Sequence, residues 1–482
     1  METPAPPPPP QQMHFLFVTS PLQGHINPVR RLAARVMAAN PDARVTFSTA
    51  VSGHRRMFPS LARPDDEAVD AAGVLHVPFS DGFDDGFSSA APGAGAAYRA
   101  RAAAAGRATL SAAVSRLAAR GTPVTRVVYT FLVPWAPDVA RAHGVPAALF
   151  WIQPAAVLAV YYHYFHGHAT ALAACANGAG AAATSLPGLP PLEAGALPSA
   201  VAITSPEHKH YLLLDLLRDL FLSLDEHKPM VLVNTFDALE SDALRAVPQF
   251  EVAAVGPVVP DDASSSPSSA LDLLHPQDAK VPYMEWLDAK PARSVVYVSF
   301  GSVLSMSRRQ EEEMRRGLEA TSRPYLWVAR TAADGGASSD GDPDPDSGSA
   351  RGLVVAWCDQ VRVLAHPAVG CFVTHCGWNS ALESVTRGVP MVAAPQWTDQ
   401  PTVAWMVEAR AGAGVRAGAD GEGVVERGEL RRCVEEVMGG GGEAIRARCD
   451  RWRELAREAV APGGTSERNL RAFASGAAVD GA

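Results

Sequence analysis

Short, predominantly apolar runs alternate with segments of helical periodicity along most of the chain. An apolar run of this length predicts a strand that is buried on both faces of a parallel sheet. Such runs stand at residues 14–19, 44–49, 74–78, 126–130, 145–151, 252–258, 294–300, 325–329, 353–356, 371–374 and 391–394. Helical patterns between them span residues 28–39, 96–119, 136–143 and 379–387. The first is expected to begin at Pro28, because proline suits the first helical position. The alternation of strand and helix predicts an α/β fold with parallel sheets.

A stretch rich in Pro, Ser and Asp divides this pattern into two runs. Residues 260–269 read PDDASSSPSS, which is the composition of a linker. A length of 482 residues also exceeds what one compact core usually holds. We therefore expect a disordered proline-rich tail, two domains with a linker between them, and a last helix that packs back on the first domain. These parts are residues 1–12 (tail), 13–255 (first domain), 256–280 (linker), 281–450 (second domain) and 451–476 (last helix).

Composition and charge narrow the class of protein. The net charge of −9 argues against a nucleic-acid partner or an anionic membrane surface, since neither polyanion attracts an acidic protein. The six cysteines form no CxxC pair and are expected to be reduced thiols in a cytoplasmic protein. The first residues, METPAPPPPPQQ, lack the apolar region of a secretory signal. The apolar stretch at 145–162 is interrupted by Gln153 and Pro154, so no stable membrane insertion is expected.

Residues 357–400 carry nearly every group that would be needed to hold a nucleotide sugar. The indole of Trp357 can stack on uracil, and the carboxylate of Glu383 can accept hydrogen bonds from both ribose hydroxyls. Residues 374–377 precede the helical pattern at 379–387, where unpaired N–H groups and the helix dipole can bind a diphosphate, and Gly377 allows close approach of the backbone. The candidate donor-binding residues are Trp357, Cys358, Gln360, His375, Gly377, Trp378, Asn379, Ser380, Glu383, Asp399 and Gln400.

This segment resembles, over its whole length, the plant secondary-product signature of the UDP-dependent glycosyltransferases. Further matches are GHINP at 24–28, NTFDALE at 234–240, VGP at 255–257, FGSV at 300–303 and GGTSERNLRAF at 463–473. The resemblance implies the GT-B fold, in which two Rossmann-like domains with parallel sheets face each other across a cleft. It implies an acceptor-binding first domain, a UDP-sugar-binding second domain, and a phosphate contact at Ser302. Inverting transfer without a metal or a cofactor is also implied, with UDP-glucose as the donor substrate.

A candidate base lies between the first predicted strand and the first helix, where open α/β sheets present groups to ligands. His25 has an ordinary pKa near 6.5 and can take a proton from an acceptor hydroxyl. The alternative is a histidine that caps or packs the helix. In many members of the family this histidine is oriented by an aspartate at a strand end, but the matching residue here is Thr130. A threonine can hydrogen-bond an imidazole, yet it cannot stabilise an imidazolium by charge.

The expected function is transfer of glucose from UDP-glucose to a hydroxyl or a carboxyl of a small lipophilic plant metabolite, such as a flavonoid, an anthocyanin, another phenolic or a hormone-like carboxylic acid. In the family, galactose users tend to carry histidine where Gln400 stands, and glucuronosyl users tend to carry arginine where Trp378 stands. Candidate residues of an acceptor pocket are Phe131, Trp135, Trp151 and Gln153.

Residues 129–165 resemble the group that contains anthocyanin 5-O-glucosyltransferases and glucose-ester-forming enzymes. This resemblance and Thr130 together lead to the hypothesis that carboxylate acceptors are used at least as well as phenols. Two alternatives stay open: a donor-binding protein with little turnover, which Thr130 would suit, and a UDP-sugar hydrolase. The expected partners are a UDP-sugar and a small acceptor, and the chain is expected to be a monomer.

Overall fold

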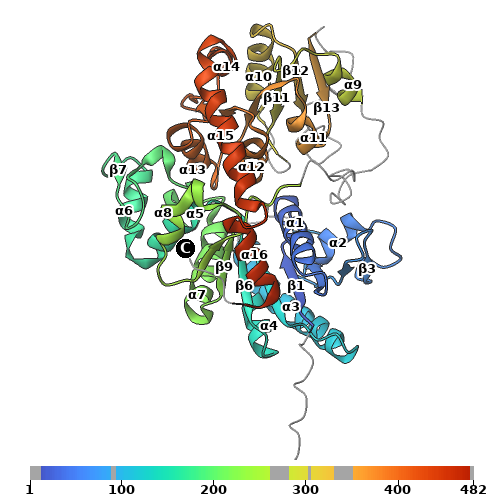
Figure 1. Cartoon of the computed structure of the whole chain (residues 1–482). Helices are drawn as coiled ribbons and strands as arrows, with labels where there is room; N and C mark the ends of the chain where they lie inside the picture. Colours follow the sequence, from blue (N-terminus) through green and yellow to red (C-terminus); the bar gives the residue numbers. More distant parts are fainter. Residues whose placement is uncertain (1–11, 88–93, 261–281, 302–305, 330–350, 478–482) are drawn as a thin grey trace, which may run out of the picture.

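Two parallel sheets form the centre of the protein, one in each half of the chain (Figure 1). The computed structural model describes residues 12–87, 94–260, 282–301, 306–329 and 351–477. Nearly all of the expected tail, most of the expected linker and Ser302 lie outside these described residues.

The sheet of the first half has, among the described residues, eight strands in the order β10-β9-β6-β5-β1-β2-β4-β3. In that order the strands are Val252–Ala254, Met230–Val233, Ala147–Trp151, Arg126–Tyr129, His14–Thr19, Arg44–Thr49, Leu75–His76 and Ala68–Val69. All neighbours are parallel except β3 and β4. The chain builds outward from β1 to one side through β2 and to the other through β5. The carboxyl ends of β1 and β5 are therefore a topological switch point, where ligands bind in open α/β sheets.

The sheet of the second half has six described strands in the order β13-β12-β11-β14-β15-β16, all parallel. In that order they are Gly352–Val355, Tyr325–Val328, Val295–Ser299, Val369–Thr374, Met391–Ala393 and Gly414–Arg416. The chain again builds outward from its first strand, β11, so that a second switch point lies at the carboxyl ends of β11 and β14. Each half thus presents one ligand-binding edge.

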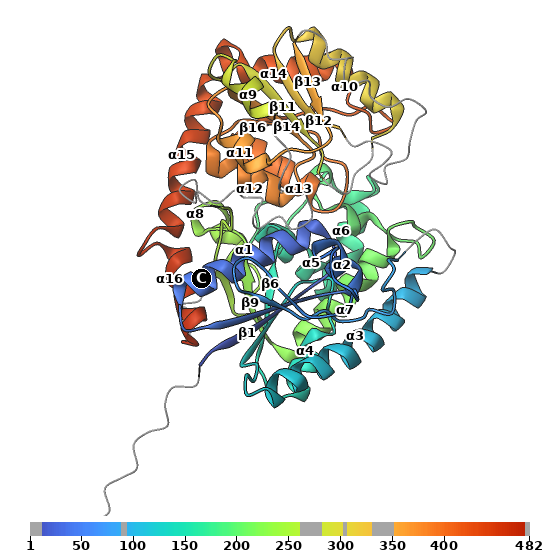
Figure 2. The same cartoon turned by 90° about the vertical axis from the view of Figure 1, so that its right-hand side faces the viewer.

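Helices surround both sheets (Figures 1 and 2). In the first half they are α1 (Gln23–Ala39), α2 (Val51–Met57), α3 (Ala94–Ala119), α4 (Ala136–Ala142), α5 (Ala155–His163), α6 (Ala169–Ala176), α7 (Tyr211–His227) and α8 (Asp237–Arg245). In the second half they are α9 (Pro282–Asp288), α10 (Arg308–Ala320), α11 (Gln360–Ala365), α12 (Trp378–Arg387), α13 (Gln400–Trp405), α14 (Arg427–Met438), α15 (Glu443–Val460) and α16 (Thr465–Ser475). A small ribbon joins β7 (Ala183–Thr184) and β8 (Leu192–Glu193).

The carboxy-terminal helices connect the two halves. The expected boundary at residue 450 falls inside α15, so two helices stand where one was expected. Helix α15 packs on α12, whereas α16 lies beside α1 of the first half (Figure 1). Its Asn469 donates Nδ2–H to the carbonyl of Ala254 at 2.9 Å, and Phe473 packs on Phe15 of β1.

Helix α1 begins five residues before the position that proline predicted. It starts at Gln23, and Pro28 lies inside it. Proline has no N–H to donate to the carbonyl four residues earlier, which is that of Gly24. That carbonyl is satisfied from the other half, because Asn379 donates Nδ2–H to it at 2.9 Å. The helix tolerates an internal proline because a residue 355 positions away completes its hydrogen bonding.

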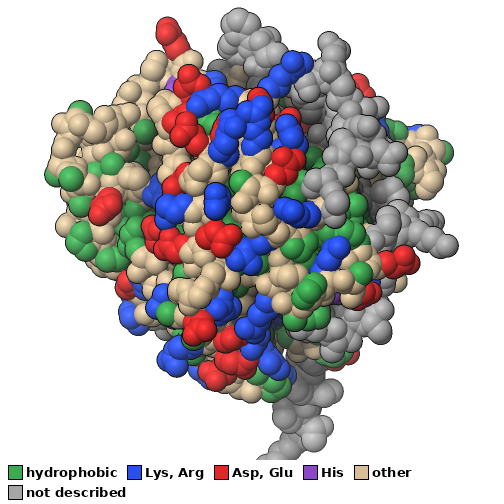
Figure 3. Space-filling model, turned by 90° about the horizontal axis from the view of Figure 1, so that it is seen from above, with side chains coloured by type: hydrophobic (Ala, Val, Ile, Leu, Met, Phe, Trp, Pro, Cys, Tyr) green, Lys and Arg blue, Asp and Glu red, His purple; other side chains and the backbone are tan. Residues whose placement is uncertain are grey.

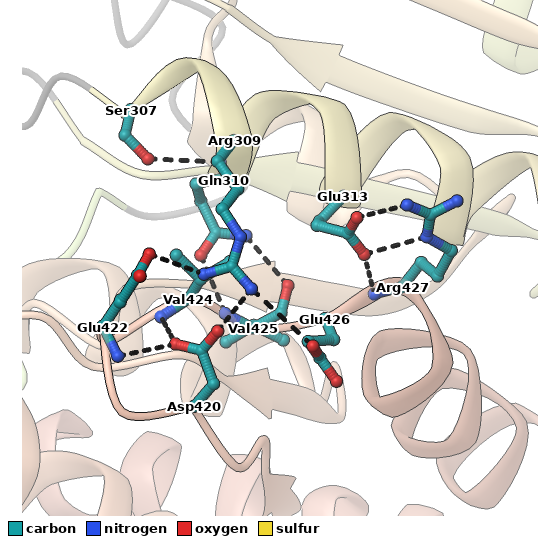
Figure 4. Close-up of polar contacts among 10 residues, drawn as sticks. All are labelled: Ser307, Arg309, Gln310, Glu313, Asp420, Glu422, Val424, Val425, Glu426 and Arg427. Atoms are coloured by element: carbon teal, nitrogen blue, oxygen red, sulfur yellow. Dashed lines mark hydrogen bonds and ion pairs between the residues drawn. The ribbon is translucent and has the colours of Figure 1, made fainter.

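Helices α10 and α14 are held together by polar contacts at the edge of the second half (Figure 4). Gln310 exchanges two amide hydrogen bonds with the backbone of Val425, at 2.9 and 3.1 Å. Arg309 forms ion pairs with Asp420 and Glu422, which lie in the loop that precedes α14. On the face seen from above, acidic and basic side chains are interspersed (Figure 3). These contacts hold α10 against the loop that precedes α14, so we assign them a structural role.

Candidate active site

His25 lies in the first turn of α1, directly after the carboxyl end of β1. Its ring packs against the ring of Phe131, with 4.8 Å between centroids, and only 7% of the residue is exposed. Burial lowers the pKa of His25 to about 3, because a charged imidazolium would lose its hydration there. The imidazole is neutral at physiological pH and can accept a proton.

Thr130 is the hydrogen-bond partner of this histidine. It follows β5, the neighbour of β1, so the two residues meet at the switch point of the first sheet. His25 Nδ1 lies 3.3 Å from Thr130 Oγ1, which lies 3.1 Å from the hydroxyl of Thr19. With Nδ1 protonated and donating to Thr130, Nε2 carries the lone pair. The pair orients the ring but provides no negative charge.

The second half presents the start of α12 at the switch point of its own sheet. Gly377 is the N-terminal cap residue and has no side chain with which to cap the helix, while the Asp399 carboxylate accepts a hydrogen bond from the backbone N–H of Trp378. Gly377 and Gly301 both adjoin the ring of His375, since a Cβ at either position would lie under 3 Å from it. Burial lowers the pKa of His375 to about 4, so this ring is neutral at physiological pH. The arrangement offers backbone N–H donors to an anion.

Gln360, Ser380 and Glu383 form one hydrogen-bonded cluster. Gln360 donates Nε2–H groups to Glu383 Oε2 at 2.7 Å and to Ser380 Oγ at 2.9 Å. Its own carbonyl oxygen accepts from the hydroxyl of Tyr297 at 3.2 Å. The carboxylate is buried and fixed by these contacts, as a group that receives ribose hydroxyls should be. Trp357 lies half-buried in the loop that precedes α11.

The loop that carries Asp399 and Gln400 reaches the first half. Asp399 Oδ1 accepts hydrogen bonds from Thr398 Oγ1 at 2.7 Å and from Gln153 Nε2 at 3.2 Å. Burial raises the pKa of Asp399. Gln400 Oε1 accepts from two backbone N–H groups of its own loop, which fixes its side chain. Gln153, expected in the acceptor pocket, thus contacts the second half.

The side chains of two candidate donor residues are held by contacts within the protein. The indole N–H of Trp378 donates to the carbonyl of Asn234 in the first half at 2.7 Å. The thiol of Cys358 is buried 3.3 Å from the hydroxyl of Tyr297, and burial raises its pKa to about 12. Only the backbone of Cys358 is available to a ligand.

The four expected acceptor-pocket residues separate in the structure. Trp135 lines a cavity of about 290 Å³ between α3, α4 and α7. Trp151 is fully buried and its indole N–H donates to the carbonyl of Pro154, so its assignment to the pocket surface was wrong. A side chain on a central strand with both neighbours paired points into the core. Phe131 lies between His25 and Trp151, and its ring packs against both.

Arg31 is a site residue that the sequence did not reveal. Its Nη1 lies 2.7 Å from Glu383 Oε1, across the interface between the two halves. The sequence signal is a pair of adjacent arginines, Arg30 and Arg31, in a helical pattern at 28–39 that is apolar apart from these two and Arg35. A charge at such a position needs a partner, but the chain gives no indication that the partner is 352 residues away.

Within the described residues, no group of three or more His, Cys, Asp or Glu side chains is arranged to hold a metal ion. No helix in the described part of the chain is both long and apolar enough to cross a membrane.

Comparison with known proteins gives consistent matches. The family model described as UDP-glucoronosyl and UDP-glucosyl transferase matches residues 272–440. UDP-glycosyltransferase 75C1 of Solanum lycopersicum is 42% identical over 477 residues, which cover 96% of this chain and 98% of that protein. Anthocyanidin 3-O-glucoside 5-O-glucosyltransferase 1 of Perilla frutescens is 43% identical over 471 residues, covering 95% and 97%. The crystal structure of Os79 from O. sativa in complex with UDP is 32% identical, with a TM-score of 0.76, and covers 96% of this chain and 100% of that one. The expected GT-B fold is confirmed.

Proposed function

The chain belongs to the plant family 1 UDP-glycosyltransferases, and from this membership we propose that it transfers glucose from UDP-glucose to a hydroxyl group of a small lipophilic plant metabolite. His25 is the base in this proposal, and transfer inverts the configuration at C1 of the sugar.

The observation that carries the proposal is a neutral, oriented imidazole at the switch point of one sheet and a helix start that begins at a glycine at the switch point of the other. Burial keeps His25 neutral, and Thr130 orients its ring. Nε2 accepts the proton of the acceptor hydroxyl as the oxygen attacks C1. The bond from C1 to the diphosphate oxygen breaks in the same step, on the opposite face of C1, and UDP leaves with the negative charge.

The donor half supports departure of UDP. The N–H groups at the start of α12 and its dipole stabilise charge that develops on the diphosphate. Trp357 and Glu383 are assigned to the uracil and to the ribose hydroxyls, and Asp399 and Gln400 to the sugar. Loss of a stacked base costs about 1–3 kcal/mol, so Trp357→Ala should weaken UDP binding by roughly that amount in calorimetric titration. Trp286→Ala, on α9 of the same half, is the matched control and should leave UDP affinity unchanged.

The cavity beside Trp135 is suited to the body of the acceptor. Apolar side chains line it together with a few polar groups, as is usual for small-molecule sites. Ser20, in the turn before α1, is buried, and its hydroxyl has no hydrogen-bond partner among the described residues. Asp81 is also buried, and its carboxylate accepts a hydrogen bond from the backbone N–H of Phe83. Ser20 and Asp81 suit an acceptor that carries hydroxyl groups.

A hydroxyl acceptor is favoured over a carboxylate by the charges at this site. Asp81 adds negative charge, and the cavity arginines Arg99 and Arg107 are already paired with carboxylates on neighbouring helices. The described neighbours of His25 are aromatic or uncharged, so an ionised carboxylate beside it would lose hydration without gaining a counter-ion. A phenol enters uncharged and does not meet this cost.

A UDP-release assay with UDP-glucose, with and without a matched panel of phenols and carboxylic acids, tests the proposal. We expect release that depends on phenols, and a loss of about 10²–10⁴-fold in His25→Ala, the usual contribution of general base catalysis. Release without acceptor would identify a hydrolase. UDP binding without release would identify a donor-binding protein, and faster glucose-ester formation than glucoside formation would assign the carboxyl group instead.

We also propose a cytoplasmic monomer. All six cysteines are buried and unpaired, which suits a reducing compartment. Light scattering of the purified protein tests the monomer.

A further inference from the structure

Helices α1 and α12 are joined by two polar contacts that run in the same order along both helices. Gly24 of α1 accepts from Asn379 of α12 at 2.9 Å, and Arg31 of α1 donates to Glu383 of α12 at 2.7 Å. Figure 2 shows α1 at the edge of the first half that faces α12. The carboxylate assigned to the ribose is therefore bound by a residue of the acceptor half.

We propose that Arg31 is a positioning residue for the donor, because it holds the Glu383 carboxylate in the orientation that receives the ribose hydroxyls. This inference rests on the proposed donor site. It adds a residue from the acceptor half to the set that binds UDP, and it makes the ribose site complete only when both halves are in contact.

The hydrogen-bonding capacity of the carboxylate allows this role. Each carboxylate oxygen has two lone pairs. Arg31 Nη1 uses one on Oε1, and Gln360 Nε2 uses one on Oε2, both at 2.7 Å. One lone pair on each oxygen is left for a pair of neighbouring hydroxyls. Arg31 and Gln360 each bind one oxygen of the carboxylate and leave acceptor capacity on both oxygens.

Because the Glu383 carboxylate is buried, it needs the contact with Arg31. The side chain of Glu383 is 7% exposed and that of Arg31 14% exposed. Without Arg31 the carboxylate would lose the charge that compensates its burial, and it would turn towards water. It would then receive the ribose hydroxyls poorly. His25 lies six residues before Arg31 on the same helix, so one rigid element sets both the base and the ribose contact.

The opposite role predicts the opposite result. If Arg31 competed with ribose for Glu383, its removal would tighten UDP binding. If it only stabilised the fold, its removal would affect UDP and 2′-deoxy-UDP equally. The ratio of the two affinities therefore isolates the contact between Glu383 and the 2′-hydroxyl.

The experiment measures binding of UDP and 2′-deoxy-UDP by calorimetry in the full chain and in Arg31→Ala, Arg31→Gln, Arg31→Lys and Glu383→Gln. Arg315→Ala is the matched control, since Arg315 is exposed on α10 and pairs only with Glu319 among its described partners. We expect Arg31→Ala to bind UDP about 10-fold or more weakly, as for loss of a charge-assisted hydrogen bond, and to prefer UDP over 2′-deoxy-UDP less. Arg31→Lys should recover part of both effects, and Arg315→Ala should change neither.

The outcomes separate this inference from the proposed function. An unchanged affinity ratio in Glu383→Gln would overturn the ribose assignment itself. A ratio that falls in Glu383→Gln and is unchanged in Arg31→Ala, or tighter UDP binding in Arg31→Ala, would overturn the role of Arg31 alone. Arg31→Gln keeps an N–H donor and most of the volume, so the same comparison holds if Arg31→Ala does not fold.

Discussion

Thr130 gives this site a different chemistry from one with an aspartate at the same position. Its hydroxyl accepts from or donates to the imidazole at 3.3 Å and adds no charge. In the proposed mechanism, the positive charge that His25 gains on accepting a proton is therefore stabilised by hydrogen bonding and by the departing diphosphate alone. The environment makes His25 a weak base, since burial already lowers its pKa to about 3.

Replacement of Thr130 tests this reasoning. Thr130→Asp places a carboxylate beside Nδ1, which favours the imidazolium, so we expect faster turnover of phenols. Thr130→Val keeps the shape without the hydrogen bond and should slow turnover, because the ring loses its orientation. Initial rates with one phenol, measured alongside UDP affinity, check both. Turnover that is lower in Thr130→Asp than in the unmodified enzyme would contradict the charge argument.

Buried neutral histidines make the fold sensitive to acid. Burial lowers the pKa of His25 to about 3 and that of His54 and His375 to about 4. Between the unfolded value of 6.5 and these values the unfolded chain binds more protons, so the free energy of unfolding falls as the pH falls through this window. The slope approaches about 1.4 kcal/mol per pH unit for each histidine.

We therefore expect His54→Gln to flatten the loss of stability between pH 6.5 and 4.5, because glutamine does not titrate. Urea unfolding at a series of pH values measures the slope, and His208→Gln, at an exposed position, is the control. Equal slopes in the two variants would show that His54 is not the source.

Helix α3 packs against Trp135, which lines the cavity proposed for the acceptor, through a residue with no side chain. Gly106 lies in the helix interior, and a Cβ there would meet the indole of Trp135 at 2.3 Å. Gly to Ala normally stabilises a helix by up to about 1 kcal/mol. Here the rigid ring must move, and overpacking of this kind costs about 1–3 kcal/mol. We therefore expect the cost of the clash with Trp135 to exceed the gain in helix propensity.

Gly106→Ala should accordingly lower the melting temperature and weaken binding of the acceptor, whereas Gly428→Ala should not. Gly428 lies near the start of α14 with open space around it, so that change should be neutral or stabilising. Thermal unfolding of the two variants compares them. A stabilised Gly106→Ala would mean that Trp135 moves without cost.

Local patterns predict most elements and miss those that distant contacts decide. The strands at residues 14–19 and 44–49 have the predicted bounds, because each is a compact apolar run. Met230–Val233 is equally apolar, yet it was not predicted, and the predicted strand at 252–258 ends at Ala254. Pairing with β9 ends at Ala254, and Gly256-Pro257 within the run is a strand-breaking signal that the prediction did not use.

The site residues also fall into those that local patterns reveal and those that distant contacts decide. His25 and Glu383 stand out in the sequence because they lie in dense motifs, and in the structure His25 lies beside Thr130 and Glu383 beside Gln360. Arg31 was missed because its partner lies in the other half. Trp151 was misassigned because a wide aromatic near a strand end reads the same whether it faces a pocket or the core. The direction of a side chain depends on how its strand is placed in the sheet, and residue type alone does not predict it.

The whole molecule is tied together by its last helix, which follows the second half in sequence and packs on the first. Phe473 of α16 is fully buried against Phe15, with 5.5 Å between ring centroids, and the guanidinium of Arg126 lies over its ring at 4.9 Å. Asn40 of α1 adds a hydrogen bond to the carbonyl of Ala474. The first half therefore completes its core with a side chain from the end of the chain.

Phe473→Ala should destabilise the first half in particular. Deletion of a buried phenylalanine side chain costs about 3–5 kcal/mol, and the atoms that lose contact belong to β1 and β5. Hydrogen exchange should accelerate in His14–Thr19 more than in Val295–Ser299, the equivalent first strand of the other sheet. Arg471→Ala on the same helix removes an exposed side chain paired with Glu467 and should leave both strands protected. Equal acceleration in the two strands would mean that the halves unfold as one unit, and acceleration confined to α16 would mean that the helix frays without supporting β1.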